Sequence, residues 1–306
     1  MTNRINFSIV DDEGVKINCY KWIPKGEIKG IVQISHGMLE TILRYDDFAK
    51  YLNKNGYVVY GHDHRGHGKT AESKEKLGHL DKDDFNWLVE DVHLITDKIK
   101  REYKDKKVIL LGHSMGSFVS QRYIQLYSKD IHALILSGSN GKPPKVTRFA
   151  AWITNIARNV FKVDKRANII NKLTFGSYNR GLEGRTEVDW LCSDSKEVDK
   201  YIKDSYCGGV PTVSFFNELF TGLLTINTRG NFDTVRKDLP IYIFAGDKDP
   251  VGMRGKGIIN LYNKFKEIGI KDVTYKLYKD GRHEMLNEVN KKDVYLDIVS
   301  WIESKI

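Results

Sequence analysis

The sequence predicts an α/β fold in which a mostly parallel central sheet is covered by helices on both faces. Short apolar runs alternate with longer helical patterns over residues 1–140, and this alternation resumes over residues 233–306. Buried parallel strands read as such short apolar runs, and crossover helices join them. Residues 141–232 instead look helical throughout. We therefore expect one core domain, formed by 1–140 and 233–306, with a helical cap inserted at 141–232.

The first part of the core begins with a predicted hairpin, since two alternating runs flank the turn-forming residues 11–14. A long helix follows later, because Phe85, Leu88, Val92 and Ile95 recur at intervals of three and four residues. The predicted strands are 7–10, 17–22, 31–35, 57–60, 108–111 and 133–136. The predicted helices are 47–52, which ends at Asn55-Gly56, then 85–99 and 118–127.

The last part of the core repeats the pattern of strand and helix. Strands are expected at 240–245 and 273–278, and helices at 258–268 and 294–306. The loop after the first of these strands contains acidic residues, and the loop after the second contains a histidine, so both loops are candidates for catalytic side chains.

Composition excludes several classes of protein. The net charge is +9, from 49 Lys and Arg against 40 Asp and Glu, but the two signs are interleaved, so we expect no nucleic-acid partner. No apolar run approaches the roughly 18 residues of a membrane span, and no signal segment is recognisable. Three scattered cysteines predict reduced thiols and a cytoplasmic protein; the alternative is a Cys192–Cys207 disulfide.

The motif Gly112-His113-Ser114-Met115-Gly116 lies between a predicted strand and a predicted helix. This Gly-x-Ser-x-Gly pattern places a serine on a tight strand-to-helix turn, where glycines let the backbone pack closely around it. Amide groups at a helix start point toward developing negative charge. Ser114 is therefore the predicted nucleophile, with Gly112 and Gly116 forming the elbow.

A serine nucleophile needs a base and an orienting acid, and on such an elbow they follow in the order Ser, Asp or Glu, His. Asp247 and Asp249 lie in the loop after the strand at 240–245, and His283 lies in the loop after the last strand. We expect Asp249 to be the acid, because it projects further from its strand, with Asp247 stabilising the turn. His283 is the predicted base.

Two histidine-containing segments allow other interpretations. His36-Gly37-Met38 follows a strand where an oxyanion loop is expected, so the backbone N–H groups of Met38 and Met115 are the predicted donors, and His36 structures the loop. His62, His64 and His67 surround Asp63, and this set suggests a metal site and hence a metallohydrolase. We prefer no metal, with Asp63 and Arg65 fixing neighbouring loops.

Together, these motifs resemble the α/β-hydrolase superfamily, and within it the monoacylglycerol lipase and lysophospholipase family. The similarity covers nearly the whole chain. The matching residues are His36-Gly37, Arg44-Tyr45, Asp63 to Gly68, Gly112 to Gly116, Gly246 to Pro250, Gly281 to Glu284, Asp189 to Leu191 and Cys207 to Gly209. The sequence departs from the family pattern at Thr41, where histidine is frequent, and at Thr70, where serine is frequent.

The resemblance implies an α/β-hydrolase fold and a triad of Ser114, Asp249 and His283, with Met38 and Met115 as oxyanion donors and no cofactor. It also implies a carboxylic ester as substrate, most readily monoacylglycerol or lysophospholipid. A serine aminopeptidase or a thioesterase shares the same triad and is the alternative. Because the base must be neutral, we expect activity to fall below about pH 6, near the imidazole pKa of ~6.5.

The cap carries two apolar stripes at helical spacing, one from Phe149 to Ile156 and one from Phe215 to Phe220. We expect most of these side chains to pack the cap onto the core and some to line an acyl pocket. The cap also holds 14 basic and 9 acidic residues, a net +5. This excess suggests transient contact with an anionic membrane surface. The sequence does not indicate an oligomeric state.

Overall fold

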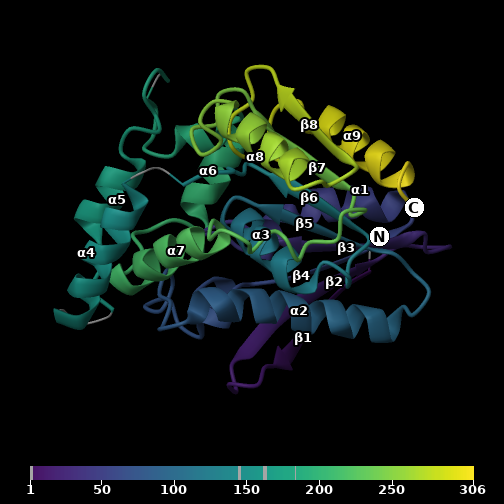
Figure 1. The fold of residues 1–306 in the computed structure, drawn as a ribbon, viewed down its shortest axis with the longest axis horizontal. Coiled ribbons are helices and arrows are strands. Elements are labelled where there is room, and N and C mark those ends of the chain that lie inside the picture. Colours follow the sequence, from purple (N-terminus) through teal and green to yellow (C-terminus); the bar gives the residue numbers. More distant parts are fainter. Residues whose placement is uncertain (1–2, 144–145, 161–163, 183) are drawn as a thin grey trace.

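The structure is a computed structural model that describes residues 3–143, 146–160, 164–182 and 184–306. Its centre is an eight-stranded sheet (Figure 1) with the strand order β1-β2-β4-β3-β5-β6-β7-β8. Strand β2 runs antiparallel to β1 and β4, and the other neighbouring strands are parallel. The strands are β1 (Asn3–Val10), β2 (Lys16–Ile23), β3 (Gly30–Ser35), β4 (Tyr57–His62), β5 (Val108–His113), β6 (Ala133–Ser137), β7 (Ile241–Gly246) and β8 (Val273–Tyr278).

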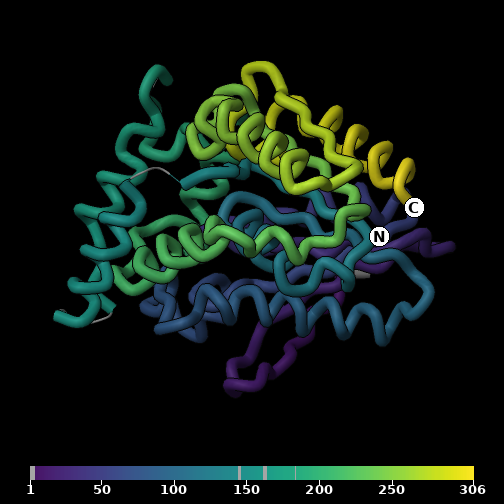
Figure 2. The backbone as a smooth tube through the Cα atoms, viewed as in Figure 1, coloured from purple at the N-terminus to yellow at the C-terminus, as the bar shows by residue number. Residues whose placement is uncertain are grey.

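Helices cover both faces of this sheet, as expected for buried parallel strands. One face packs against α2 (Asp84–Glu102), α3 (Met115–Tyr127) and α8 (Lys256–Glu267), and the other against α1 (Asp46–Lys54) and α9 (Lys291–Glu303). Alternate residues of one strand enter different cores, so that Leu110 faces the first and Ile109 the second. The predicted α/β-hydrolase type of fold is confirmed (Figure 2).

The order in which strands are added to the sheet reverses at β3. Strand β4 pairs with one edge of β3, and β5 pairs with the other edge. At such a switch point the loops that follow the strands separate and leave a crevice beyond their carboxyl ends. The loop after β3 begins at His36, and the turn after β5 holds Ser114. The fold therefore brings these two segments to one crevice.

The chain between β6 and β7 forms helices α4 (Thr147–Val160), α5 (Asn168–Phe175), α6 (Ser195–Lys203) and α7 (Val213–Ile226), and the short 3₁₀ turn η3 (Asp189–Leu191). Helices α4, α5 and α7 project to the left of the sheet in Figure 1. A single bridge between Arg166 and Thr212 is the β pairing found in the described part of this segment. The division into a core and a cap domain stays a prediction.

The two apolar stripes of this segment behave differently. The second is buried: Phe215 and Leu219 pack into the core as predicted, whereas Phe216 and Phe220 pack against residues of α4 and α7 in the same segment. The packing prediction is wrong for the first stripe, because Phe149 and Trp152 are 58% and 59% exposed and Ile153 and Ile156 are exposed as well. Helical spacing shows that a helix has an apolar face, but it does not show what covers that face.

Helix α4 packs on α7 through small side chains instead. Ala151 and Thr154 are the buried residues at its centre. The amide of Asn217 on α7 donates to the Ala151 carbonyl and to the Thr154 hydroxyl, both at 3.2 Å. These hydrogen bonds hold the face of α4 that carries Ala151 and Thr154 against α7, so the large apolar side chains point outward.

Other differences from the sequence prediction concern element ends and cysteines. Strand β1 starts at Asn3 rather than residue 7, because its alternating polar residues form an exposed edge strand, and helix α3 starts at Met115 rather than 118. Cys192 and Cys207 are free thiols, as is Cys19, so the alternative of a disulfide is wrong.

Candidate active site

Ser114 occupies a single-residue turn between β5 and α3. Its φ of 52° and ψ of −118° lie outside the regions that a serine normally adopts. A Cβ at Gly112 would lie 2.4 Å from the Gly116 carbonyl oxygen, and one at Gly116 would lie 2.1 Å from the Ser35 carbonyl oxygen. Only glycine at both positions lets β5, α3 and β3 approach this closely, and this packing holds the strained serine in place.

Backbone N–H groups beside Ser114 are available to a ligand. The first amides of a helix have no intrahelical acceptor. Those of Ser117 and Phe118 donate to the Ser114 carbonyl at 2.9 and 3.3 Å, which leaves the Met115 amide at the helix start. Met38 lies opposite, in the loop after β3, and no acceptor for its amide exists among the described residues. These are the two N–H groups that the sequence predicted as oxyanion donors.

Asp249 and His283 form a buried pair next to Ser114. His283 Nδ1 lies 2.9 Å from Asp249 Oδ1, and neither side chain is more than 2% exposed. The Val251 amide also donates to Asp249 Oδ1 at 2.8 Å, which fixes the carboxylate. His283 and Ser114 line the same pocket. The structure thus brings the three predicted triad residues together at the carboxyl edge of the sheet.

The surroundings select His283 among the buried histidines. Burial would lower its pKa, but the charge and hydrogen bond of Asp249 outweigh this and raise the pKa above 6.5. Burial lowers the pKa of the neighbouring His113 to about 4 and that of His36 to about 4. At neutral pH these neighbours are neutral, so His283 is the histidine placed to exchange a proton.

Asp247 has a different role from the one expected. Its amide donates to the Tyr278 carbonyl at 2.9 Å, but its carboxylate accepts no hydrogen bond from the described residues. The turn is therefore held by the backbone of Asp247 and not by its side chain.

An ion-pair network that the sequence analysis did not assign joins the two loops of the site. Arg44 donates to Glu284 through two nitrogens, at 2.5 and 2.6 Å, and to Glu40 at 2.8 Å. Burial alone would raise the pKa of Glu284, yet the charge of Arg44 lowers it to about 2. Glu40 also accepts from the Gly37 amide at 2.5 Å. Arg44 therefore ties the residue after His283 to the residues that flank Met38.

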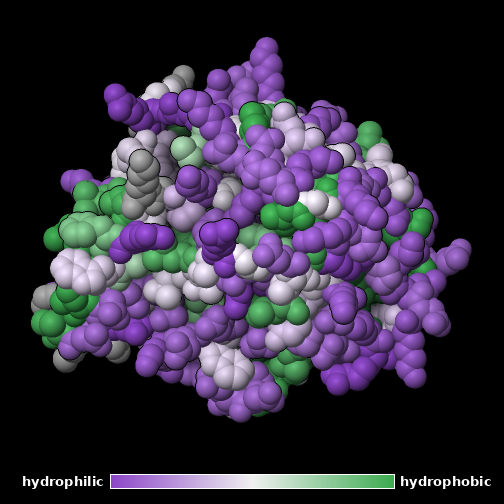
Figure 3. All heavy atoms as spheres, viewed as in Figure 1, coloured by the Kyte–Doolittle hydropathy of each residue, from purple (hydrophilic) through white to green (hydrophobic). Residues whose placement is uncertain are grey.

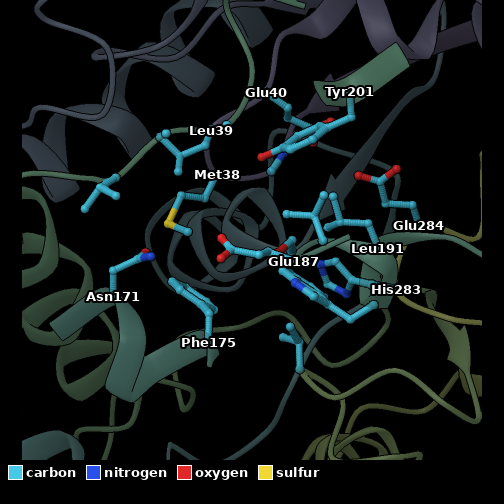
Figure 4. Close-up of a pocket in the computed structure, with 18 of the residues that line it drawn as sticks. Met38, Leu39, Glu40, Asn171, Phe175, Glu187, Leu191, Tyr201, His283 and Glu284 are labelled. Carbon is cyan, nitrogen blue, oxygen red and sulfur yellow. The ribbon is translucent and has the colours of Figure 1, made fainter. Parts of the chain in front are cut away.

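The pocket over Ser114 has a volume of about 650 Å³. Figure 4 shows Met38, Phe175 and His283 reaching it from separate elements. Its floor holds Gly37, His113, Ser114 and His283, and its walls include Leu39, Asn171, Phe175, Glu187, Trp190, Leu191 and Tyr201. Neither apolar stripe of the cap contributes a lining residue, so the expectation that some of them line an acyl pocket is wrong.

The histidine-rich loop after β4 packs tightly. His36 Nδ1 donates to the Gly37 carbonyl at 2.7 Å while its Nε2 accepts from the His64 amide at 3.0 Å, so His36 structures the loop as expected. Asp63 accepts from the amides of Ile42 and Lys69, which fixes two neighbouring segments. Within the described ranges, no three His, Cys, Asp or Glu side chains are arranged to hold a metal ion.

Arg65 in the same loop lies among several carboxylates. Its guanidinium contacts Asp91 at 2.9 Å and also pairs with Asp11 and Asp84. These contacts anchor the loop after β4 to the first hairpin and to the start of α2, the fixing role that the sequence suggested for Arg65.

Residues 26–290 match the family described as serine aminopeptidase, S33. The chain belongs to the serine aminopeptidase S33 family. This match includes the Ser114 elbow, the loops that hold Asp249 and His283, and the helices between β6 and β7. The family assignment therefore covers both the sheet and the inserted helices.

Several curated relatives of this S33 family member are lipases by name. Human monoglyceride lipase is 33% identical over 306 residues, which cover 97% of this chain and 90% of the relative. A monoacylglycerol lipase from Mycolicibacterium smegmatis is 26% identical and is matched over 100% of this chain and 99% of its own length.

Solved structures agree with these relatives. A thermostable carboxyl esterase from Bacillus coagulans, in complex with glycerol, is 26% identical with a TM-score of 0.91, over 100% of this chain and 99% of that chain. A monoglyceride lipase from Saccharomyces cerevisiae is 22% identical with a TM-score of 0.75, over 100% and 96% of the two chains, and shows the shared fold. This S33 family member is therefore an ester-hydrolysing enzyme with the α/β-hydrolase fold.

The Arg44 network generates a prediction on stability. Replacing Arg44 with Met leaves two buried carboxylates without their cation, and breaking such a pair costs about 3 kcal/mol or more. We expect the free energy of unfolding, measured by urea denaturation, to fall by about that amount. Lys50→Met is the control, because Lys50 pairs with Asp46 at the surface, where a pair is worth under about 1 kcal/mol. Equal losses in the two variants would contradict the structural role of Arg44.

Proposed function

We propose that this enzyme hydrolyses carboxylic esters through an acyl-enzyme on Ser114, with His283 as base and Asp249 as the acid that orients it. The observation that carries the proposal is the buried His283–Asp249 pair, 2.9 Å apart, in the pocket that also holds the strained Ser114. A serine on a strained elbow needs such a pair to become a nucleophile, because its own pKa is too high.

The reaction has two steps. His283 takes the hydroxyl proton of Ser114 as the oxygen attacks the ester carbonyl, and it then gives that proton to the leaving alcohol. The Met38 and Met115 amides hold the oxyanion, and a donor of this kind contributes about 3 kcal/mol. Water, activated by the same His283, then releases the acid from Ser114. No cofactor takes part in either step.

We propose a substrate with one acyl chain and a polar alcohol, such as monoacylglycerol or lysophospholipid. A cavity of about 650 Å³ suits a ligand of that size. Its lining is divided, with Met38, Leu39, Phe175 and Leu191 as apolar groups and Glu40 and Asn171 as polar ones. The names of the curated relatives, monoglyceride and monoacylglycerol lipase, support the same class.

One observation favours the alternative, a serine aminopeptidase. The Glu187 carboxylate faces the pocket (Figure 4) and forms no ion pair with the described residues. A carboxylate in that place attracts a protonated amine, which an amino-acyl substrate carries and a monoacylglycerol lacks. A thioester needs no such group, so nothing at Glu187 favours a thioesterase.

A substrate panel tests the proposed reaction. We expect glycerol monoesters and 4-nitrophenyl esters of graded chain length to be hydrolysed faster than amino-acyl amides, and Ser114→Ala to lose more than about a thousandfold of the ester activity. A fluorophosphonate probe should label the wild type and not Ser114→Ala. Ser8→Ala is the matched control, since it removes the hydroxyl of an exposed serine on β1 that does not line the pocket. Labelling of Ser114→Ala, or full activity in it, would refute the role of Ser114. Faster cleavage of the amides, lost in Glu187→Gln, would establish the aminopeptidase instead.

The pH dependence follows from the environment of His283. The base acts only when neutral, and Asp249 raises the pKa of His283 above 6.5. The acid limb of kcat/KM should therefore have its midpoint above pH 6.5, higher than the sequence alone suggested. The measurement uses a neutral ester between pH 5 and 9, so that the substrate does not titrate. A midpoint at or below 6.5, or a flat profile, would contradict this assignment.

We further propose that the enzyme acts peripherally at a membrane through the apolar surface of α4 and α5. We define this surface as Phe149, Trp152, Ile153, Ile156, Val160, Ile169 and Leu173, all exposed. Figure 3 shows hydrophobic residues gathered over these helices. On its other side, α5 lines the pocket with Asn171 and Phe175, so a lipid surface on these helices lies next to the entrance.

We also propose that the enzyme is cytoplasmic. No helix in the described residues is both long and apolar enough to cross a membrane. The free thiols of Cys19, Cys192 and Cys207 suit a reducing compartment, and they support the cytoplasmic location that the sequence suggested.

Membrane contact through this surface is tested with vesicles. Trp152→Ser removes a large aromatic side chain from the surface and should weaken binding to phosphatidylcholine and phosphatidylglycerol vesicles roughly tenfold, measured by co-sedimentation. Leu296→Ser is the control, because Leu296 is 57% exposed but lies on α9, at the other end of the molecule (Figure 1). Equal binding by the two variants would exclude docking through α4.

A further inference from the structure

A second hollow, of about 1140 Å³, lies outside the Ser114 pocket. It is bounded by the start of α4, the end of α7 and the second half of α8. Four cationic side chains line it: Lys142, Arg148, Arg229 and Lys264. None of its lining residues belongs to the Ser114 pocket, so this hollow is a separate feature of the surface.

These four cations lack counter-charges. None of them forms an ion pair with any residue that the structure describes, in contrast to Arg44, Arg65 and Arg158, which each pair with a buried carboxylate. Glu267 is the carboxylate in the lining, and it too has no ion-pair partner among the described residues. The hollow therefore keeps a net positive charge of about three, with one acid that opposes an anion at its edge.

Lys264 is partly buried without a carboxylate to balance its charge. Its side chain is half-buried, and its Nζ donates to the Asn227 side-chain oxygen at 2.8 Å and lies 4.0 Å from the centre of the Phe232 ring. Burial without a neighbouring carboxylate lowers the pKa of Lys264 to about 8. Because this ammonium group is partly desolvated and contacts only an amide oxygen and an aromatic ring, an anion that binds beside it would be stabilised by its charge.

We propose that this hollow binds a phosphate-bearing anion. A group with up to two charges suits several cations around one cavity better than a single carboxylate does, and arginine forks match phosphate oxygens. The cavity exceeds the size of a phosphate ion, so the anion carries a further polar group. Asn260 and Asn263 line the same hollow and offer side-chain amides to the hydroxyls of such a group, whereas the amide of Asn227 already bonds to Lys264 and to the Leu223 carbonyl.

The ligand has two sources, a soluble phosphomonoester or the headgroup of an anionic phospholipid. The hollow is adjacent to the apolar surface, because Arg148 and Phe149 are consecutive on α4. A lipid whose headgroup enters the hollow would therefore have its chains near Phe149. The site does not depend on the proposed esterase, since none of its residues contacts Ser114 or His283.

The experiment compares two variants with two probes. Arg148→Gln combined with Arg229→Gln removes two cations of the hollow, whereas Lys266→Gln removes an exposed cation of α8 that does not line it. The probes are glycerol 3-phosphate, followed by calorimetry, and vesicles of ether-linked phosphatidylcholine with a third of ether-linked phosphatidylglycerol. Neither probe contains a carboxylic ester, so failure of the proposed hydrolysis leaves the result unaffected.

We expect the double variant to bind at least one probe about 25-fold more weakly than the wild type, at roughly fivefold for each cation, and Lys266→Gln to change binding less than twofold. Glycerol 3-phosphate as the affected probe identifies a soluble phosphomonoester, and vesicles alone identify a lipid headgroup. The proposal fails if neither probe binds the wild type at millimolar concentration in low salt. It also fails if the double variant binds as tightly as Lys266→Gln. Unchanged circular dichroism and thermal unfolding in all three proteins confirm that they are folded.

Discussion

The candidate site depends on one buried cation, Arg44, placed between two buried carboxylates. Glu40 lies four residues before Arg44 and Glu284 lies 240 residues after it, yet both carboxylates contact the same guanidinium. A cation and two anions in the interior are costly unless the remaining lone pairs are satisfied. Here the Tyr45 hydroxyl and the Gly37 amide donate to Glu40, and the Asn287 amide donates to Glu284. Because Glu284 follows His283 and Glu40 bonds to the Gly37 amide beside Met38, the network fixes the position of His283 relative to the loop that holds Met38.

The sheet topology and the network act together. The switch at β3 opens the crevice, and the carboxyl ends of β5, β7 and β8 bring Ser114, Asp249 and His283 to its edge. Position alone does not select a base, since His113 has its ring centre only 4.6 Å from that of His283. The difference comes from Asp249, which raises the pKa of one histidine, while burial lowers the pKa of the other to about 4. Geometry and electrostatics therefore favour the same residue.

Much of the fold could be predicted from the sequence, because buried parallel strands and amphipathic helices leave local patterns. The Gly-x-Ser-x-Gly elbow and the order of Asp249 and His283 are likewise local signals, which is why the structure places the predicted residues in one pocket. The Arg44 network leaves no such signal: its partners lie on distant loops, and only the family motif hinted at them. The direction in which α4 faces was predicted wrongly for a related reason. The stripe from Phe149 to Ile156 is local, but the small residues that pack α4 onto α7 are recognised only when Asn217 is placed opposite them.

The orientation of α4 links the two outer features of the molecule. Had its large side chains packed inward, α4 would have presented no apolar surface to the solvent. Instead Ala151 and Thr154 face α7, and the aromatic face with Arg148 at its beginning turns outward. An apolar surface beside a hollow of unpaired cations matches the two chemical halves of an amphiphile, chains and anionic headgroup. Since α5 adds apolar residues to that surface and polar ones to the Ser114 pocket, the helices between β6 and β7 connect the proposed lipid-binding surface to the pocket that holds Ser114. The packing of small residues on α4 thus decides which way this part of the enzyme faces.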